Sequence, residues 1–206
     1  MNKTNQLGMA LFAAVVIPLI APNQVAASVV VFNSAQGYDL VTPQFGIDNS
    51  AFELIEYEGF YDSISGGQDN NRWTIESTSG IQGTMGEWIT SAEAGAPLNI
   101  TFQSDNVFAV GGTFYVIEDG GNTPVPGIMR LTLSDGTTFF NDLSEQGMFA
   151  GFMSTGSSIK SMSIYAFGSD STTESAAISN LTVGVVPAPA SLMLLSIGLG
   201  LRRRRS

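Results

Sequence analysis

The chain has 206 residues, of which 44% are hydrophobic and only 13% are charged, a size that fits one ordinary domain plus terminal segments. It contains neither cysteine nor histidine, which excludes Ser-His-Asp and Cys-His nucleophiles and any zinc or copper site built on those ligands. Only three basic residues, Arg72, Arg130 and Lys160, lie between residues 28 and 185, against all 18 acidic residues. This segment therefore has a net charge of −15 and repels nucleic acid and anionic lipid, whereas cations and neutral polymers are easier partners.

The first 27 residues have the pattern of a secretory signal peptide. Lys3 provides the positive flank, residues 7–20 form an apolar run, and small residues lead up to Ala27. We expect signal peptidase to cut between Ala27 and Ser28. The alternative, an uncleaved membrane anchor, is disfavoured because the run is short and is interrupted by Pro18.

Short runs that alternate apolar and polar side chains follow, and this period of two predicts strands with one buried and one wet face. The predicted strands cover residues 29–32, 72–78, 98–102, 129–133, 162–166 and 178–183. Residues 107–117 are apolar on both faces, which predicts a central strand, and Gly111-Gly112 within it indicates a bulge or a close backbone approach. One short helix is expected over residues 48–55, behind an N-cap candidate at Asp48 or Ser50.

Turn signals separate these runs. Asp135-Gly136 predicts a hairpin between Leu133 and Phe139. Many short strands at such spacing indicate an all-β domain over residues 28–185, an antiparallel β-sandwich of the jelly-roll type. We expect its core to include Ile100, Phe102, Val110, Phe114, Val116, Leu131, Leu133, Ile164, Ile178 and Leu181.

Carboxylates are the acid–base groups that this composition leaves for catalysis. Glu53, Glu56, Glu58 and Asp62 lie close together in the sequence, and Glu87 precedes Trp88. A pair of such groups could hydrolyse a glycosidic bond, but nothing in their spacing marks an acid and a nucleophile. We therefore expect a solvated acidic face and no enzyme activity, and keep a carboxylate-dependent glycosidase as an alternative.

Oxygen ligands for calcium are present in several turns. They are Asp69-Asn70-Asn71, Asp105-Asn106, and Glu118-Asp119 with Asn122. None of these matches the EF-hand loop, and Asp and Asn also serve turn geometry. Calcium is thus a candidate cofactor without an assigned site.

Carbohydrate binding would use aromatic side chains on a sheet face or a loop. Trp88 and Tyr165 are the candidates for ligand binding, although Trp and Tyr side chains are more often part of a core. Tyr165 is the better of the two, because Ser161 and Ser163 lie on the same face of its predicted strand.

The last segment, residues 186–206, has three parts in a fixed order. Val186 and Pro187-Ala188-Pro189 come first, an apolar stretch over residues 190–201 follows, and the end is basic, with Arg202, Arg203, Arg204 and Arg205. As a helix the apolar stretch would be about 18 Å long, shorter than the ~30 Å hydrocarbon core of a bilayer. The arginines should stay in the cytoplasm during a transient membrane insertion.

This order of proline, short apolar helix and basic cluster resembles the PEP-CTERM sorting signal, which is read by exosortases. The usual Pro-Glu-Pro is replaced here by Pro187-Ala188-Pro189. The resemblance implies cleavage by an exosortase near these prolines. It also implies an exported protein at the cell surface or outside the cell, associated with exopolysaccharide or a biofilm.

The middle of the chain resembles jelly-roll domains that are common among exported proteins with this tail. The matching segments include Val110-Gly111-Gly112-Thr113-Phe114, Phe149-Ala150-Gly151-Phe152 and Ile178-Ser179-Asn180-Leu181-Thr182-Val183. The resemblance implies a non-catalytic surface or matrix protein, and the alternatives are a carbohydrate- or calcium-binding module and the glycosidase.

Overall fold

The structure is a computed structural model that describes residues 28–118, 123–167 and 174–187. The expected signal peptide, residues 1–27, and the expected sorting tail beyond Pro187 lie outside these ranges. Among the helices in the described ranges, none has the length and apolar character needed to cross a membrane.

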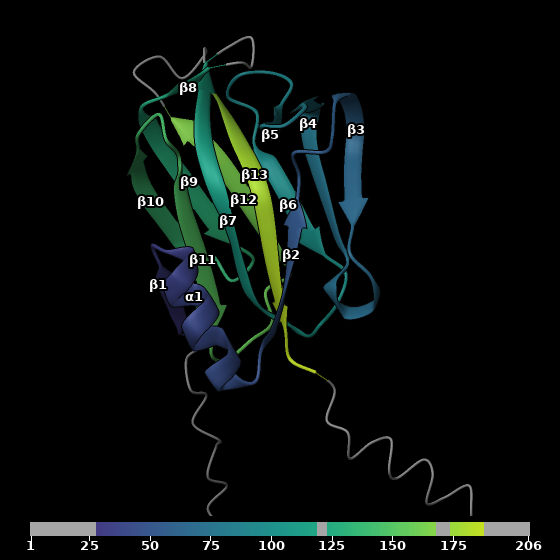
Figure 1. The fold of residues 1–206 in the computed structure, drawn as a ribbon, viewed down its shortest axis with the longest axis vertical. Coiled ribbons are helices and arrows are strands. Elements are labelled where there is room, and N and C mark those ends of the chain that lie inside the picture. Colours follow the sequence, from purple (N-terminus) through teal and green to yellow (C-terminus); the bar gives the residue numbers. More distant parts are fainter. Residues whose placement is uncertain (1–27, 119–122, 168–173, 188–206) are drawn as a thin grey trace, which may run out of the picture.

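The described residues form two layers of antiparallel strands packed face to face, with a short helix on the front layer (Figure 1). Their strands are β1 (Val29–Phe32), β2 (Asp48–Glu53), β3 (Gly59–Gly66), β4 (Trp73–Thr84), β5 (Trp88–Ser91), β6 (Leu98–Phe102), β7 (Val107–Glu118), β8 (Pro124–Val125), β9 (Gly127–Leu133), β10 (Thr138–Leu143), β11 (Met148–Ser154), β12 (Ser161–Phe167) and β13 (Glu174–Val185). The predicted all-β, antiparallel sandwich is thus confirmed.

One continuous hydrogen-bonded path runs β1-β11-β7-β13-β5-β4-β6-β12-β9-β10, with β2 paired to β13, β3 to β4 and β8 to β7. The long strand β4 carries this path from one layer to the other. Its first part, from Trp73 to Glu76, pairs with β6, and its last part, from Ile81 to Thr84, pairs with β5. Gly80 lies between the two parts with a φ of 85°, a conformation that glycine adopts without a steric penalty.

The core fills the space between the layers. All ten residues that the alternation predicts as core are buried, with exposed fractions of 4% or less. The predicted hairpin at Asp135-Gly136 is also confirmed, because it joins β9 to β10 with Gly136 at a φ of 87° and the Asp135 carboxylate accepts a hydrogen bond from the Thr137 amide.

The helix predicted over residues 48–55 is wrong. This segment is instead strand β2, which pairs with β13 and turns Phe52 toward the core. Tertiary pairing outweighs the local cap signal here. The α-helix of the described residues is α1 (Ala35–Val41), followed by a 3-10 turn, η1 (Thr42–Phe45), and a second 3-10 turn, η2 (Asp69–Asn71), lies between β3 and β4. Helix α1 starts where the Ser34 hydroxyl accepts a hydrogen bond from the Gly37 amide.

The predicted central strand is confirmed as β7, which lies between β11 and β13. Its glycine pair serves a close approach. A Cβ atom on Gly112 would lie 2.6 Å from the Asn180 carbonyl oxygen. The irregularity in the pairing lies on the partner strand, where the register with β7 shifts between Ile178 and Asn180.

Candidate functional site

The outer face of the back layer brings three large side chains into one row. Phe140 of β10 lies opposite Arg130 of β9, and Arg130 lies opposite Tyr165 of β12. The next row along the same face contains Ile128 and Phe167. We call these five residues, Ile128, Arg130, Phe140, Tyr165 and Phe167, the platform.

Arg130 is held in the platform by stacking on aromatic rings. Its guanidinium carbon lies 5.1 Å from the ring centroids of both Tyr165 and Phe167, which is cation–π distance and stabilises the pair by about 0.5–1 kcal/mol at an exposed site. The two rings are themselves 4.6 Å apart, and Phe140 lies 6.5 Å from Phe167. The four side chains therefore form one connected cluster.

The platform is open to solvent. Phe140 is 58% exposed and Ile128 is 43% exposed, while the other three side chains are half-buried. A polar row lies beside it on the same face, formed in register by Thr138, Thr132, Ser163 and Asn99. The face thus combines exposed apolar area with hydroxyl and amide groups.

The nitrogen atoms of Arg130 remain available to a ligand. Within the described residues the one ion pair joins Lys160 to Asp105, and Arg130 makes no hydrogen bond there. A guanidinium group has five N–H donors in a fixed plane. These donors can reach hydroxyl, carbonyl or carboxylate oxygens of a ligand.

The structure places Tyr165 on the wet face of its strand, as the alternation predicts, but it places Trp88 differently. Trp88 is only 7% exposed and packs against Tyr115, with ring centroids 5.4 Å apart, and against Ile117 and Ala177. Any contact between Trp88 and a ligand would be limited to the small exposed part of its side chain. Its role in binding stays a prediction.

The calcium candidates within the described residues form no carboxylate cluster. No group of three or more carboxylate side chains that could hold a metal ion occurs in the described ranges. The Asn71 side chain is used locally, since its oxygen accepts from the Gln68 amide and its nitrogen donates to the Ser50 hydroxyl, and Asp105 pairs with Lys160. Asp119 and Asn122 lie outside the described residues, so calcium binding stays a prediction.

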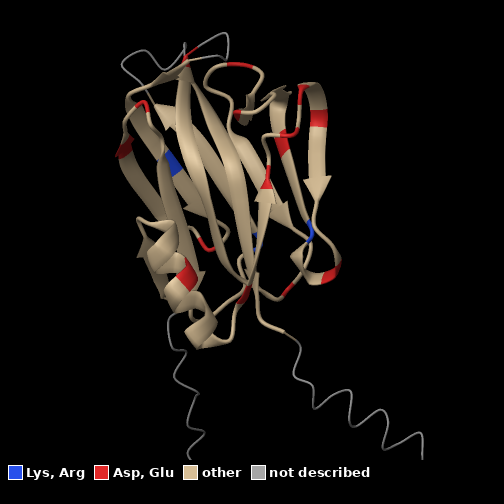
Figure 2. Ribbon diagram, in the orientation of Figure 1, with Lys and Arg blue, Asp and Glu red and all other residues tan. Residues whose placement is uncertain are grey.

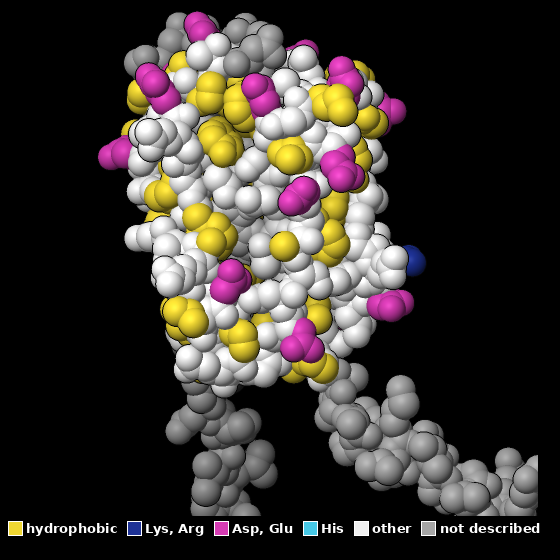
Figure 3. All heavy atoms as spheres, in the orientation of Figure 1, with side chains coloured by type: hydrophobic (Ala, Val, Ile, Leu, Met, Phe, Trp, Pro, Cys, Tyr) yellow, Lys and Arg dark blue, Asp and Glu magenta, His cyan; other side chains and the backbone are white. Residues whose placement is uncertain are grey.

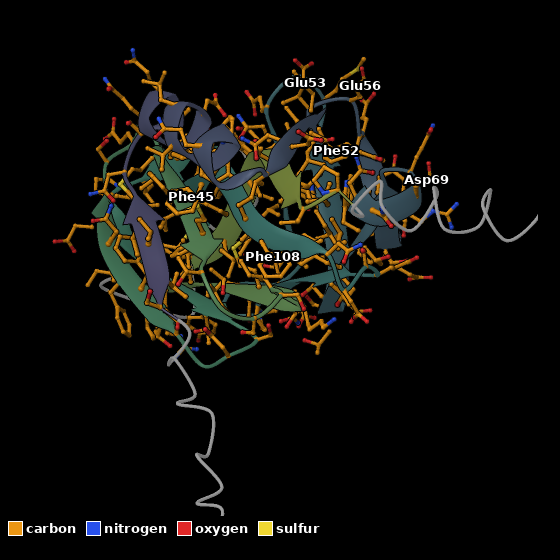
Figure 4. The ribbon with its side chains drawn as sticks, turned by 90° about the horizontal axis from the view of Figure 1, so that it is seen from below. Phe45, Phe52, Glu53, Glu56, Asp69 and Phe108 are labelled. Atoms are coloured by element: carbon orange, nitrogen blue, oxygen red, sulfur yellow. The ribbon has the colours of Figure 1, made fainter. Side chains whose placement is uncertain are left out.

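The carboxylates clustered in the sequence also lie on the surface. Glu53, Glu56, Glu58 and Asp62 are all exposed, and Glu53 and Glu56 project to the same side of the molecule (Figure 4). Acidic residues occur along the loops and strand edges of the whole domain, whereas basic residues are few (Figure 2). This distribution is that of a solvated acidic face.

Sequence reasoning identified Tyr165 but missed the other four members of the platform. A signal for them was present. The Asp135-Gly136 hairpin fixes the register of β9 and β10, and this register sets Phe140 opposite Arg130. The pairing of β9 with β12, which adds Tyr165 and Phe167, joins segments far apart in the chain and had no local signal.

Of the known proteins compared with this chain, only solved structures are similar to it. No family model matches the chain, and no curated protein matches it. A family two carbohydrate esterase from Cellvibrio japonicus matches with a TM-score of 0.40 and 11% identity over 69% of this chain, which spans 36% of that structure.

Two smaller structures match at a similar level. A xylan-binding domain from Paenibacillus barcinonensis has a TM-score of 0.36, with 14% identity over 69% of this chain and 98% of that one. A family 35 carbohydrate-binding module from Clostridium thermocellum has a TM-score of 0.33, with 14% identity over 66% of this chain and 97% of that one. We draw no functional conclusion from likenesses this distant.

Proposed function

We propose that this protein is a non-catalytic carbohydrate-binding protein that uses the platform to bind neutral polysaccharide. The observation that carries the proposal is the exposed cluster of Phe140, Tyr165, Phe167 and Arg130 on an otherwise polar sheet face. A sugar ring has an apolar C–H face, which packs on an aromatic ring, and a rim of hydroxyl groups that need donors and acceptors. The platform and the adjacent polar row offer both.

The charge of the domain favours a neutral ligand. Arg130 is one of three basic residues in a segment of net charge −15, and Asp142 lies in register with Ile128 at the edge of the platform. A polymer with a negative charge on each unit would be repelled by this field. A neutral polymer would accept hydrogen bonds from Arg130 and donate them to Asp142.

The platform is better suited to binding than to hydrolysis. A glycosidase places two carboxyl groups on opposite sides of the scissile bond, roughly 5 to 10 Å apart. Among the described residues, Asp142 is the carboxylate in register with the platform, opposite Ile128. The proposal therefore contains no catalytic residue.

The setting that we propose is outside the cell. The signal-peptide pattern of residues 1–27 and the resemblance of residues 186–206 to a sorting signal support export and processing by an exosortase. A surface or matrix protein in that location would meet extracellular polysaccharide. The exosortase and signal peptidase are proposed partners during export.

A binding screen tests the function directly. The purified protein is run through native gels that contain soluble neutral or acidic polysaccharides, and its retardation is compared with that of bovine serum albumin. We expect retardation by at least one neutral polysaccharide without release of reducing sugar. Retardation by none of the neutral polymers, or release of reducing sugar that a single carboxylate substitution abolishes, would refute the proposal.

A further inference from the structure

A second row of ligand-like side chains lies on the opposite layer of the sandwich. Phe149 of β11, Thr113 of β7, Asn180 of β13 and Glu53 of β2 follow one another in register across the front sheet. The neighbouring row consists of small residues, namely Gly151, Gly111, Thr182 and Ala51. The row of Phe149, Thr113, Asn180 and Glu53 thus lies beside a strip of smaller side chains.

The two glycines of the small row make room for the Phe149 ring. A Cβ atom at Gly111 would lie 2.9 Å from this ring, whereas at Gly151 it would meet the Tyr38 ring first, at 2.6 Å, and the Phe149 ring at 3.0 Å. The Phe149 ring therefore rests on the backbone at Gly111 and lies edge-on to the Tyr38 ring, with the ring centroids 5.8 Å apart. Between α1 and β2 the surface forms a groove of about 230 Å³, lined by Ala35, Ala51, Phe52, Glu53, Thr113, Phe149, Asn180 and Thr182. We call it the groove. Binding pockets for larger ligands are typically ~300–1,000 Å³. The groove is smaller than these pockets and has room for about one sugar ring.

The polar groups of the groove floor are held in place. The Asn180 side-chain oxygen accepts from the Thr113 amide at 2.9 Å, and its nitrogen donates to the Thr113 hydroxyl at 3.1 Å. The hydroxyl of Thr182 makes no hydrogen bond within the described residues. These fixed and free polar groups lie between an aromatic wall, Phe149, and the carboxylate of Glu53.

We propose that the groove is a second sugar-binding site, so that the protein binds two segments of neutral polysaccharide at once, one on each layer. The inference rests on the proposed carbohydrate-binding function. Phe149 would pack on the C–H face of a sugar ring, Asn180 and Thr182 would bond its hydroxyl groups, and Glu53 would accept from a further hydroxyl. Glu53 also disfavours an acidic sugar, and basic side chains lie only at the margin of this face (Figure 3).

Two sites on opposite layers have a consequence that one site does not. The core lies between the platform and the groove, so a single sugar chain does not lie flat on both. Each protein would instead join two chains or two distant segments of one chain. Such a protein cross-links a polysaccharide gel, and its overall avidity exceeds the affinity of either site.

The test is a stoichiometry measured with short neutral sugars. Cellohexaose, xylohexaose and mannohexaose are titrated by calorimetry into the protein and into three variants. Ala51→Trp fills the groove from an exposed position, Phe140→Ala removes the main exposed ring of the platform, and Thr78→Trp is a matched control at an exposed position of β4. Circular dichroism and the unfolding midpoint establish that each variant is folded.

We expect two sugars per protein chain in the wild type and in Thr78→Trp, and one in Ala51→Trp. In Phe140→Ala we expect one site with unchanged affinity and one whose Kd is roughly fivefold higher. Thr182→Val, which removes the hydroxyl at nearly constant shape, should weaken the groove alone. A single bound sugar whose affinity falls in Phe140→Ala and is unchanged in Ala51→Trp would overturn the second site while the proposed function stands. Binding of none of the three sugars would overturn both.

Discussion

The Asn180 side chain accepts the hydrogen bond from the Thr113 amide at a point where the backbone pairing between β13 and β7 is irregular. The register between β13 and β7 shifts between Ile178 and Asn180, and the Thr113 amide donates to the Asn180 side chain at 2.9 Å. The Asn180 side-chain nitrogen also donates to the Thr113 hydroxyl at 3.1 Å. The Asn180 side chain therefore compensates for the irregular pairing between β7 and β13, the two longest strands of the front layer.

Replacing Asn180 by alanine should destabilise the protein. The variant leaves the Thr113 amide without its side-chain acceptor, and an unsatisfied, partly buried donor costs about 1–3 kcal/mol. Asn180→Asp retains an acceptor and should cost less. Urea unfolding of the three proteins measures the difference. A loss below about 0.5 kcal/mol in Asn180→Ala would mean that the irregularity does not depend on this side chain.

Tyr38 should make the protein sensitive to alkaline pH. Tyr38 is the buried residue of α1, and its hydroxyl has no hydrogen-bond partner among the described residues. Burial, with a smaller effect of Asp39, raises the pKa of Tyr38 far above its usual value. The folded state thus favours the neutral phenol. The stability from this group is complete below the unfolded pKa of about 10 and is lost as the pH rises above it.

Tyr38→Phe tests this dependence. It removes a buried polar group that lacks a partner, so we expect a gain of about 1 kcal/mol at pH 7 and a smaller loss of stability between pH 9 and 11. Tyr57→Phe is the control, because burial also raises the pKa of Tyr57 but its side chain is only half-buried. Identical pH profiles for wild type and Tyr38→Phe would contradict the argument.

Phe140 and Phe60 provide a matched pair for the platform. Both are exposed, at 58% and 64%, but Phe60 lies over Gly80 near the corner of the sandwich. Phe140→Ala should weaken binding to the retarding polysaccharide by about 1 kcal/mol, roughly fivefold in Kd, and Phe60→Ala should not. Both should keep their stability within about 0.5 kcal/mol. Equal binding by the two variants would place the ligand elsewhere.

The two tryptophans give a further test of where the ligand lies. Trp73 is 2% and Trp88 is 7% exposed, so we expect emission typical of buried indoles and weak quenching by acrylamide. Neither belongs to the platform or lines the groove, and saturation with polysaccharide should leave the emission maximum unchanged. A shift that disappears in Trp88→Phe would restore Trp88 as a ligand contact.

The sequence predicts those strands that obey a local rule, whereas β3, β5, β8 and β11 were not predicted. Alternation sets Ile100 and Phe102 inside β6 and leaves Asn99 and Thr101 on the wet face. It fails at β2, where an N-cap candidate at Asp48 or Ser50 suggested a helix. The stabilising partner of β2 is β13, which lies more than a hundred residues later, and no local pattern contains that information.

The difference between local patterns and long-range strand pairing also explains which residues of the two candidate sites could be predicted. Tyr165 stood out because its own strand has serines on the same face. The groove joins α1, β2, β7, β11 and β13, so its residues come from five separate segments. Three of them, around Gly111, Phe149 and Asn180, lie within the segments that resemble exported jelly-roll domains, but their meeting in one groove depends on pairings that the sequence does not display.

The position at which the folded domain begins predicts where the signal peptide is cleaved. Ser28 is the first described residue, and it is already tied to the fold, since its hydroxyl lies 2.9 Å from the Thr155 hydroxyl and its carbonyl accepts from the Thr155 amide. Cleavage between Ala27 and Ser28 would leave this contact and all of β1 in place. Cleavage a few residues later would remove the edge strand that pairs with β11.

We therefore expect mass spectrometry of the exported protein from its host to give Ser28 as the first residue and to lack Arg202 to Arg205. A mature protein that retains Met1 or the four arginines would refute the processing. A chain that begins after Phe32 and unfolds at the same urea concentration as the longer form would show that β1 is dispensable.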